Sequence, residues 1–175
     1  GPLRTKTGFS IAWHYTVNKG SHVRTGQVDV SSYFLAYTFP RIAVYDDIDG
    51  WDDASYKGTQ EFYNDWGNFD AEITVPRGFV VWGTGDLQNA KEVFSDRIFN
   101  NYQLARSSTA IVHIIDSTDY MKGIVTADVP QLTWKFSAQE VTDFAFAISD
   151  HYLWDGSSLL VDKASGRKVF VDAAY

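Results

Sequence analysis

The sequence predicts a mostly β domain: an antiparallel β-sandwich or saddle-like sheet with one clear helix at about residues 88–103 and a short helical turn near 138–142. Segments with apolar residues at alternate positions recur along the 175 residues, and turn residues separate them. Only one long stretch has helical spacing. Aromatic residues make up 16% of the chain and the apolar fraction is 45%, so the chain can bury a core and is not disordered.

The strands are predicted from period-two patterns. Every odd-numbered residue from Phe9 to Val17 is large and apolar, and residues 69–75 alternate in the same way before Pro76-Arg77-Gly78. Phe79–Trp82 is a continuous apolar run, which is typical of a fully buried strand. Further strands are predicted at Ile111–Ile115, Leu132–Phe136, Phe144–Ile148 and Leu159–Val161, and after the hairpin loop Asp162–Gly166. In that last strand Val169, Val171, Ala173 and Tyr175 share one face, and Phe170 lies on the other.

Helix signals are few. Asp86 is the predicted cap of a helix in which Ala90, Phe94, Ile98 and Tyr102 are spaced four residues apart. Ser137-Ala138-Gln139-Glu140 has the pattern of a capping box ahead of Val141, which predicts the short turn. Residues 46–68 are rich in Asp, Gly, Asn, Trp and Tyr, and we expect one long ordered surface loop there. The whole chain, 1–175, is predicted to be one β-rich domain.

Charge and composition exclude several functions. The chain has 22 acidic and 15 basic residues, a net charge of −7, which argues against nucleic acid or an anionic membrane as a partner. Residues 46–70 contain eight acidic residues and one basic residue, so this segment alone carries −7. No apolar run approaches the roughly 20 residues of a membrane-spanning helix, so membrane insertion is not expected. The absence of cysteine excludes disulfides, thiolate metal sites and thiol catalysis.

No catalytic motif is present. The histidines are His14, His22, His113 and His151, and no two are four residues apart as in the zinc motif His-Glu-x-x-His. Gly-x-Ser-x-Gly is also absent. Gly83-Thr84-Gly85 resembles part of a dinucleotide-binding loop, but Gln88 occupies the third glycine position, so a strand-to-helix turn is the preferred interpretation. We therefore assign no catalytic residue and no cofactor to this chain.

Two loop features are candidate binding sites. Asp46, Asp47 and Asp49 could hold a cation or could stabilise the loop by accepting from backbone amides; the second interpretation is preferred because an EF-hand alignment puts tyrosines at the first and last ligand positions. The same region contains a group of aromatic residues. These aromatic residues are Trp51, Tyr56, Tyr63 and Trp66. They favour an alternative function, a free-standing binding module whose most plausible ligand is carbohydrate.

Several motifs occur in an order that resembles a known family. They are Tyr33–Asp47 (YFLAYTFPRIAVYDD), Gly50-Trp51, Tyr63–Pro76 (YNDWGNFDAEITVP), Val80–Gly85 (VVWGTG), Thr133–Phe136 (TWKF) and Asp143–Ala147 (DFAFA). The stretch from Tyr33 to Asp155 resembles the amino-terminal domain of M1-family zinc aminopeptidases (gluzincins) of the Bacteroidetes type. In this comparison Pro2–Val17 resembles the middle of the family's domain.

The resemblance implies a noncatalytic domain that packs on a catalytic domain and walls one side of its substrate cleft. The partners implied are the chain's own catalytic domain beyond Tyr175 and a peptide substrate. Zinc and the exopeptidase motif would belong to the catalytic domain of the longer protein that the resemblance implies. An exported location, periplasmic or in the cell envelope of a bacterium, is implied by resemblance to exported relatives.

The resemblance also points to two cleft residues. The family's loop corresponding to Ala36–Pro40 approaches the cleft and often carries Gln or Glu for the substrate amine. Tyr37 stands where Gln is frequent, so Tyr37 and Thr38 are the substrate-cleft candidates, with a phenol available to accept from an ammonium. The alternative is that this segment is a core strand leading into Pro40.

Overall fold

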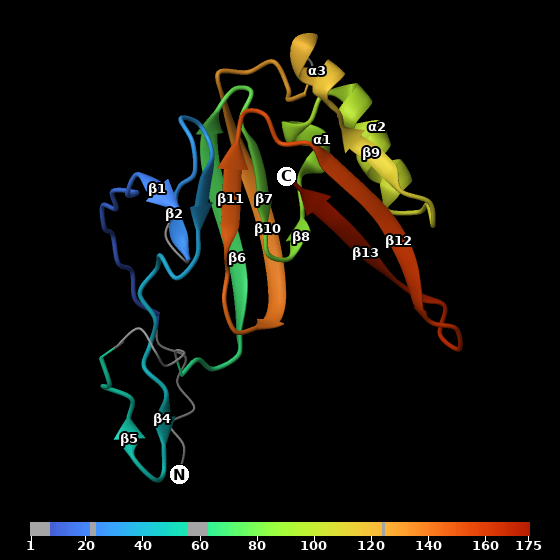
Figure 1. The fold of residues 1–175 in the computed structure, drawn as a ribbon. Helices are drawn as coiled ribbons and strands as arrows, with labels where there is room; N and C mark the ends of the chain where they lie inside the picture. Colours follow the sequence, from blue (N-terminus) through green and yellow to red (C-terminus); the bar gives the residue numbers. More distant parts are fainter. Residues whose placement is uncertain (1–7, 22–23, 56–62, 124) are drawn as a thin grey trace.

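The computed structural model describes residues 8–21, 24–55, 63–123 and 125–175. The described part of the chain is mostly β, as predicted, and all its paired strands are antiparallel (Figure 1). The strands are β1 (Gly20–Ser21), β2 (Thr25–Gln27), β3 (Tyr33–Leu35), β4 (Tyr45–Asp46), β5 (Gly50–Trp51), β6 (Gly67–Pro76), β7 (Val80–Gly83), β8 (Asp86–Leu87), β9 (Val112–Ile115), β10 (Gln131–Val141), β11 (Phe146–Ser149), β12 (Trp154–Asp162) and β13 (Arg167–Ala174). The helices are α1 (Ala90–Val93), α2 (Asp96–Ala105) and α3 (Ser117–Met121).

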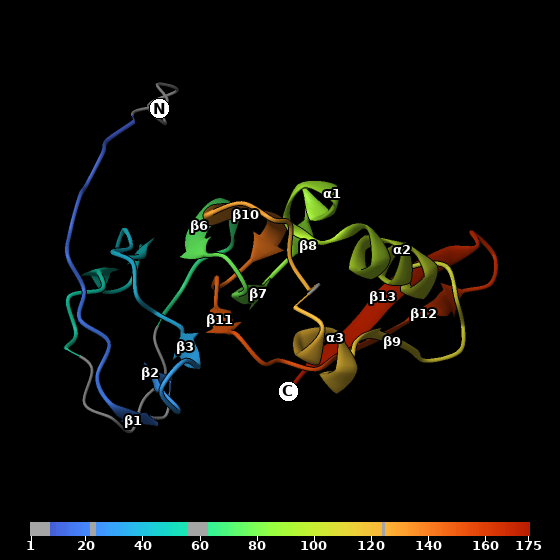
Figure 2. The ribbon, with the colours of Figure 1, turned by 90° about the horizontal axis from the view of Figure 1, so that it is seen from above.

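Two sheets form a sandwich-like body. One has the order β1-β2-β3-β11-β7 and the other has the order β6-β10-β8. In the front view the two sheets overlap, and from above they are seen as two layers (Figures 1 and 2). The core lies between and beside them, where Val80, Val81 and Trp134 have no exposed surface. The apolar run Phe79–Trp82, predicted to be a fully buried strand, corresponds to β7. Val80 and Val81 are buried, and Phe79 and Trp82 are half-buried.

A third sheet, β13-β12-β9, extends to one side of this body. Helix α2 lies beside it, and Ile98 and Tyr102 of this helix are buried (Figure 2). The β12–β13 hairpin continues past the helix, where Leu159 pairs with Val169 and both side chains are exposed (Figure 1). The loop of this hairpin has Gly166 at φ 71°, the left-handed conformation predicted for it.

The alternating pattern of residues 69–75 is confirmed in β6. Phe69, Ala71, Ile73 and Val75 are half-buried or buried, and the residues between them are exposed. The strand pairs along its whole length with β10. Alternation therefore identified both the strand and its inward face.

The prediction of one continuous helix over about residues 88–103 is wrong, because α1 and α2 are separate helices. Ala90, Phe94, Ile98 and Tyr102 are all buried, so the apolar stripe is confirmed, but Phe94 has extended backbone between α1 and α2. Phe94 forms a β-bridge with Thr126, and these backbone bonds compete with helix continuation. A new helix starts at Ser95, whose side chain caps it. Asp86 is not a cap; it lies in β8.

The helical turn near 138–142 is also wrong. Residues up to Val141 belong to β10, and the pairing with β6 shifts register between Ala138 and Val141. Glu140 has φ 53°, and its backbone N–H donates to the Asn68 side chain at 2.9 Å. Ser137 and Ala138 thus pair regularly with β6, and Gln139 and Glu140 lie in a β-bulge, which long-range pairing stabilises over a local helix.

The predicted strand at residues 9–17 is not formed. The backbone there pairs with no described strand, and odd- and even-numbered residues from 9 to 16 are exposed alike. Phe9, Ile11, Trp13 and Tyr15 are each exposed by about half or more. Alternation specifies the two faces of a strand, but a strand also needs a neighbouring strand that forms backbone hydrogen bonds with it.

Gly85 is the position where the fold is least tolerant of a side chain. It has φ 90°, and an added Cβ would lie 2.4 Å from the Ser137 carbonyl oxygen. We expect Gly85→Ala to lower the free energy of unfolding by about 3 kcal/mol or more, because backbone strain and a backbone clash add. Gly78→Ala is the control, since Gly78 has φ 87° but open space around it. It should cost only about 1–2 kcal/mol in the same urea titration. Equal costs for the two would contradict the close approach at Ser137.

Candidate functional site

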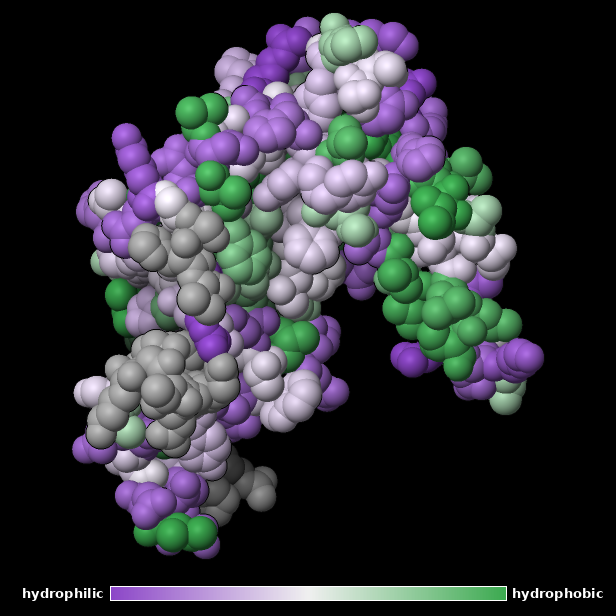
Figure 3. Space-filling view, in the orientation of Figure 1, coloured by the Kyte–Doolittle hydropathy of each residue, from purple (hydrophilic) through white to green (hydrophobic). Residues whose placement is uncertain are grey.

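A pocket opens between the body and the β12–β13 hairpin. Its volume is about 330 Å³, and in the space-filling view the surface is hollowed between these two parts (Figure 3). Its walls include three strands that lie at sheet edges in the described part of the chain, β7, β8 and β13, together with the central strands β10 and β12. We call it the Asp172 pocket. Its aromatic lining is Trp82, Tyr102, Phe136, Trp154 and Phe170, and its ionisable lining is Asp86, Arg106, Lys168 and Asp172.

The Asp172 carboxylate joins two of these walls. The indole N–H of Trp82 in β7 donates to Oδ2 at 3.2 Å, and that of Trp154 in β12 donates to the same oxygen at 2.8 Å. Burial raises the pKa of Asp172, and the two indoles and the charge of Arg106 oppose this rise only in part. Both indoles donate to the same oxygen, Oδ2, and Asp172 is one of the residues that line the pocket.

Arg106 forms the second polar anchor. It follows α2, and its guanidinium donates to Asp86 Oδ1 and to the Tyr102 hydroxyl oxygen, each at 3.2 Å. The same group lies over the Phe170 ring, 5.2 Å from its centroid. Phe170 in turn packs against Gly156, where an added Cβ would be 2.9 Å from the ring. Arg106, Tyr102 and Phe170, which all line the pocket, therefore hold one another in position.

Sequence reasoning missed this pocket. Its residues come mainly from β7, β8, α2, β10, β12 and β13. Trp82, Gly83, Gly85 and Phe136 lie in motifs that the sequence analysis named, but none of those motifs predicted a pocket here. The available signal was Phe170 on the second face of the last strand. With Asp172 two residues on, it marked a face that carries both an aromatic and a charged group.

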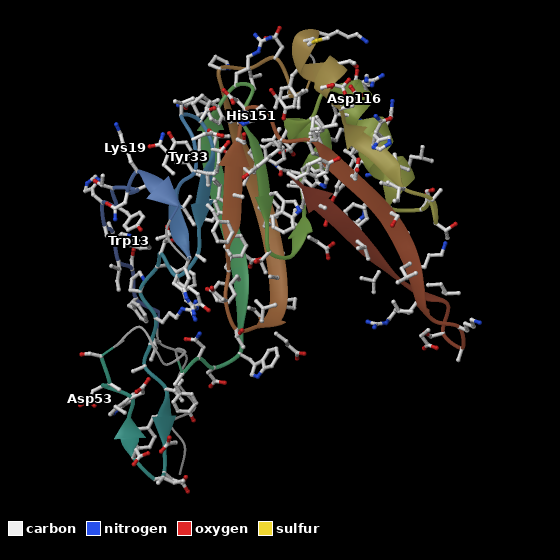
Figure 4. All side chains as sticks on the ribbon, viewed as in Figure 1. Trp13, Lys19, Tyr33, Asp53, Asp116 and His151 are labelled. Atoms are coloured by element: carbon white, nitrogen blue, oxygen red, sulfur yellow. The ribbon has the colours of Figure 1, made fainter. Side chains whose placement is uncertain are left out.

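The two substrate-cleft candidates have different surroundings. Tyr37 has φ 55°, and its ring lies between the guanidinium groups of Arg24 and Arg41, at 5.0 and 4.9 Å. Arg41 also pairs with Asp143. Thr38 lines a cavity of about 430 Å³, together with Trp13 (labelled in Figure 4), Tyr15 and residues 69–73 of β6. The structure thus brings Thr38 to a cavity, and the substrate-cleft role of both residues stays a prediction.

The aspartates of the 46–53 loop lie on the β4–β5 hairpin. Asp46 Oδ1 accepts from the backbone N–H of Ile48 at 2.9 Å and of Asp49 at 2.7 Å, and these bonds lower the pKa of Asp46. Asp47 and Asp49 are exposed. Asp46 therefore has the geometry of a loop-stabilising side chain. Cation binding by the three residues stays a prediction.

The loop aromatics are exposed where the structure describes them. Trp51, Tyr63 and Trp66 are 61%, 55% and 69% exposed, and Tyr56 lies outside the described residues. Trp51 packs edge-to-face against Tyr45, with ring centroids 5.1 Å apart. The loop expected over residues 46–68 thus begins with a short hairpin.

A serine–histidine–aspartate cluster joins β3 to β11. Ser32 Oγ lies 3.3 Å from His151 Nε2, and His151 Nδ1 lies 2.7 Å from Asp150 Oδ1 (Figure 4). However, Asp29 Oδ2 also lies 3.2 Å from Nε2, and Ser32 is only 5% exposed. The hydrogen bond to Asp150 and the charge of Asp29 raise the pKa of His151. Because the Asp29 carboxylate shares Nε2 with Ser32 and Ser32 is buried, the cluster lacks the arrangement of an activated serine. It connects the segments beside β3 and β11, and we call it the latch.

Among the described residues, no group of three or more His, Cys, Asp or Glu side chains is arranged to hold a metal ion. The described helices also include none long and apolar enough to cross a bilayer. Comparison of the chain with protein-family models, curated proteins and solved structures found no match.

The latch predicts a pH dependence of stability. A raised histidine pKa means that the folded state binds the proton more tightly, so the stabilisation is complete below the ordinary pKa of 6.5 and is lost as pH rises through the raised value. Thermal unfolding between pH 5 and 9 should show this loss for the natural chain. The variant His151→Gln should lack that component, with Asp53→Asn on the distant hairpin as control. Parallel curves for the natural chain and His151→Gln would contradict the latch.

Proposed function

We propose that this chain is the noncatalytic amino-terminal domain of a zinc aminopeptidase of the M1 family, which packs on its catalytic domain and walls the substrate cleft. The family motifs from Tyr33 to Asp155 support the assignment. The observation that carries it is an exposed apolar sheet face on β12 and β13.

The register of the hairpin defines this face. Leu159 pairs with Val169, and Ser157 pairs with Val171, so these residues share one side of the sheet. Leu159, Val169 and Val171 are 58%, 37% and 51% exposed, and Val161 beyond them is 43% exposed. The hydrophobic surface is visible on the projecting hairpin in Figure 3. A contiguous apolar face of this kind is typical of an interaction site.

Polar groups border the apolar face at one end. His113 Nδ1 lies 2.6 Å from Asp155 Oδ1, and the Tyr175 hydroxyl donates to Asp155 Oδ2 at 3.1 Å. Apolar centres with polar rims are the usual anatomy of protein interfaces. The proposed occupant is the catalytic domain, and the cavity beside Thr38 is the proposed part of the wall that faces substrate.

The described residues do not fit a zinc site. His14 is exposed, His113 bonds to Asp155, and the two ring nitrogens of His151 are each in contact with an aspartate, so none of these histidines belongs to a group of three side chains arranged for a metal ion. In the proposal, zinc and all bond-breaking chemistry belong to the catalytic domain.

The proposal is tested on the longer polypeptide that contains this chain and the residues following Tyr175. It should release amino-terminal residues from peptides in a chelator-sensitive manner, and residues 1–175 alone should not. Replacing Leu159 and Val169 by Asp should lower the Tm of the longer polypeptide by several degrees, because each apolar side chain contributes about 1.5–3 kcal/mol when fully buried at an interface. The Tm of residues 1–175 alone should change little.

Leu160→Asp is the matched control, because Leu160 is 41% exposed on the opposite side of the hairpin. It should leave the Tm of the longer polypeptide close to the natural value. A longer polypeptide without peptidase activity, or equal effects from both faces, would count against the proposal.

Carbohydrate binding is the second candidate function, favoured by the exposure of Trp51 and Trp66. Titration with oligosaccharides should then quench tryptophan emission, and Trp51→Ala or Trp66→Ala should abolish the change. Persistence of the quenching in both variants would exclude the loop as the site.

A further inference from the structure

The Asp172 pocket has the size and chemistry of a small-ligand site. Its volume of about 330 Å³ lies at the lower end of the range for such sites, and its lining combines aromatic rings with a few polar groups. Its lining residues Lys168, Phe170 and Asp172 lie on the opposite side of β13 from the apolar face discussed above, and Val169 of that face borders the pocket as well. The inference therefore does not depend on the aminopeptidase proposal.

The inward side of β13 presents a polar–aromatic–polar sequence. Lys168, Phe170 and Asp172 are at alternate positions, so they lie on one side of the strand, and all three line the pocket. Asp172 offers carboxylate oxygens, and Lys168 offers an ammonium. A ligand lying along this strand would meet hydrogen-bonding groups at both ends and an apolar surface between them.

The charges of the lining cancel. Asp86 and Asp172 oppose Arg106 and Lys168, so an anion or a cation would meet like charge as well as opposite charge. A neutral ligand with several hydroxyl groups can donate to the carboxylates and accept from the cations without this conflict.

Two of the polar anchors are already held in place. Trp82 and Trp154 fix the Asp172 carboxylate, and Asp86 and the Tyr102 hydroxyl fix the Arg106 guanidinium. A guanidinium carries more N–H donors than these two contacts use. Preorganised groups bind without the entropic cost of ordering them.

We propose that the Asp172 pocket binds a neutral polyhydroxylated ligand of monosaccharide size, with hydroxyls on Asp172, Arg106 and Lys168 and an apolar C–H face against the aromatic lining. Because Trp82 and Trp154 bond directly to Asp172, ligand binding there alters tryptophan emission.

The test is titration of the 175-residue chain with glucose, mannose, galactose and N-acetylglucosamine, followed by tryptophan fluorescence and calorimetry. At least one sugar should bind saturably. Asp172→Asn keeps the shape and an acceptor for both indoles, and it should weaken binding about ten-fold or more, because hydrogen bonds to charged groups are the stronger ones. Lys168→Met, at an exposed position, should weaken binding several-fold with no change in Tm.

Trp51→Ala is the control for the loop, and it should leave the affinity unchanged. Absence of saturable binding by all four sugars at millimolar concentration would overturn the proposal. So would binding that Trp51→Ala abolishes and that Lys168→Met and Asp172→Asn leave intact. If Asp172→Asn fails to fold, Lys168→Met decides the outcome.

Discussion

The structure depends on one half-buried carboxylate shared by two tryptophans. Asp172 accepts from Trp82 in the sandwich-like body and from Trp154 in the side sheet, so a single group fixes the position of one relative to the other. Burying a carboxylate is unfavourable, and the raised pKa of Asp172 reflects that cost. Two indole donors and the nearby guanidinium of Arg106 offset it. The interaction joins β7, at the edge of one sheet, to β12 and β13 of another, and the pocket lies where these sheets meet.

Close backbone approaches reinforce the same region. Gly85 lies against Ser137 of β10, and Gly156 lies against Phe170 of β13, each where a Cβ would collide. The first brings β8 to the edge of the β10 sheet, and the second lets the Phe170 ring lie flat enough for Tyr102 and Arg106 to pack on it. The pocket walls are thus set by glycines that local sequence patterns do not distinguish from ordinary turn residues.

Local periodicity predicted the elements that bury one face and failed where a distant partner decides the structure. The alternation in β6 and the stripe through Ile98 were readable because each element buries one face. The break at Phe94 was not, because it is caused by bonding to Thr126, more than thirty residues away. Glu140 in a β-bulge has the same explanation, since its partner is Asn68. The Asp172 pocket is the extreme case: every wall comes from a different element, so no window of sequence contains it. The α3 helix, capped by Asp116, was missed because it is too short for a periodic pattern.

Strand β13 shows how one short segment can carry two surfaces. Val169 and Val171 lie on one side of the sheet with Leu159 of β12, and Phe170 and Asp172 lie on the other side and line the pocket. Val169 borders the pocket as well, so a domain that covers the apolar face would reach the edge of the pocket. The exposed alternating residues from Phe9 to Tyr15 lie at the opposite end of the molecule (Figure 1), next to the cavity that includes Thr38. A compact partner on the hairpin would therefore leave that segment uncovered, and covering both surfaces requires either a partner that wraps the body or two separate contacts.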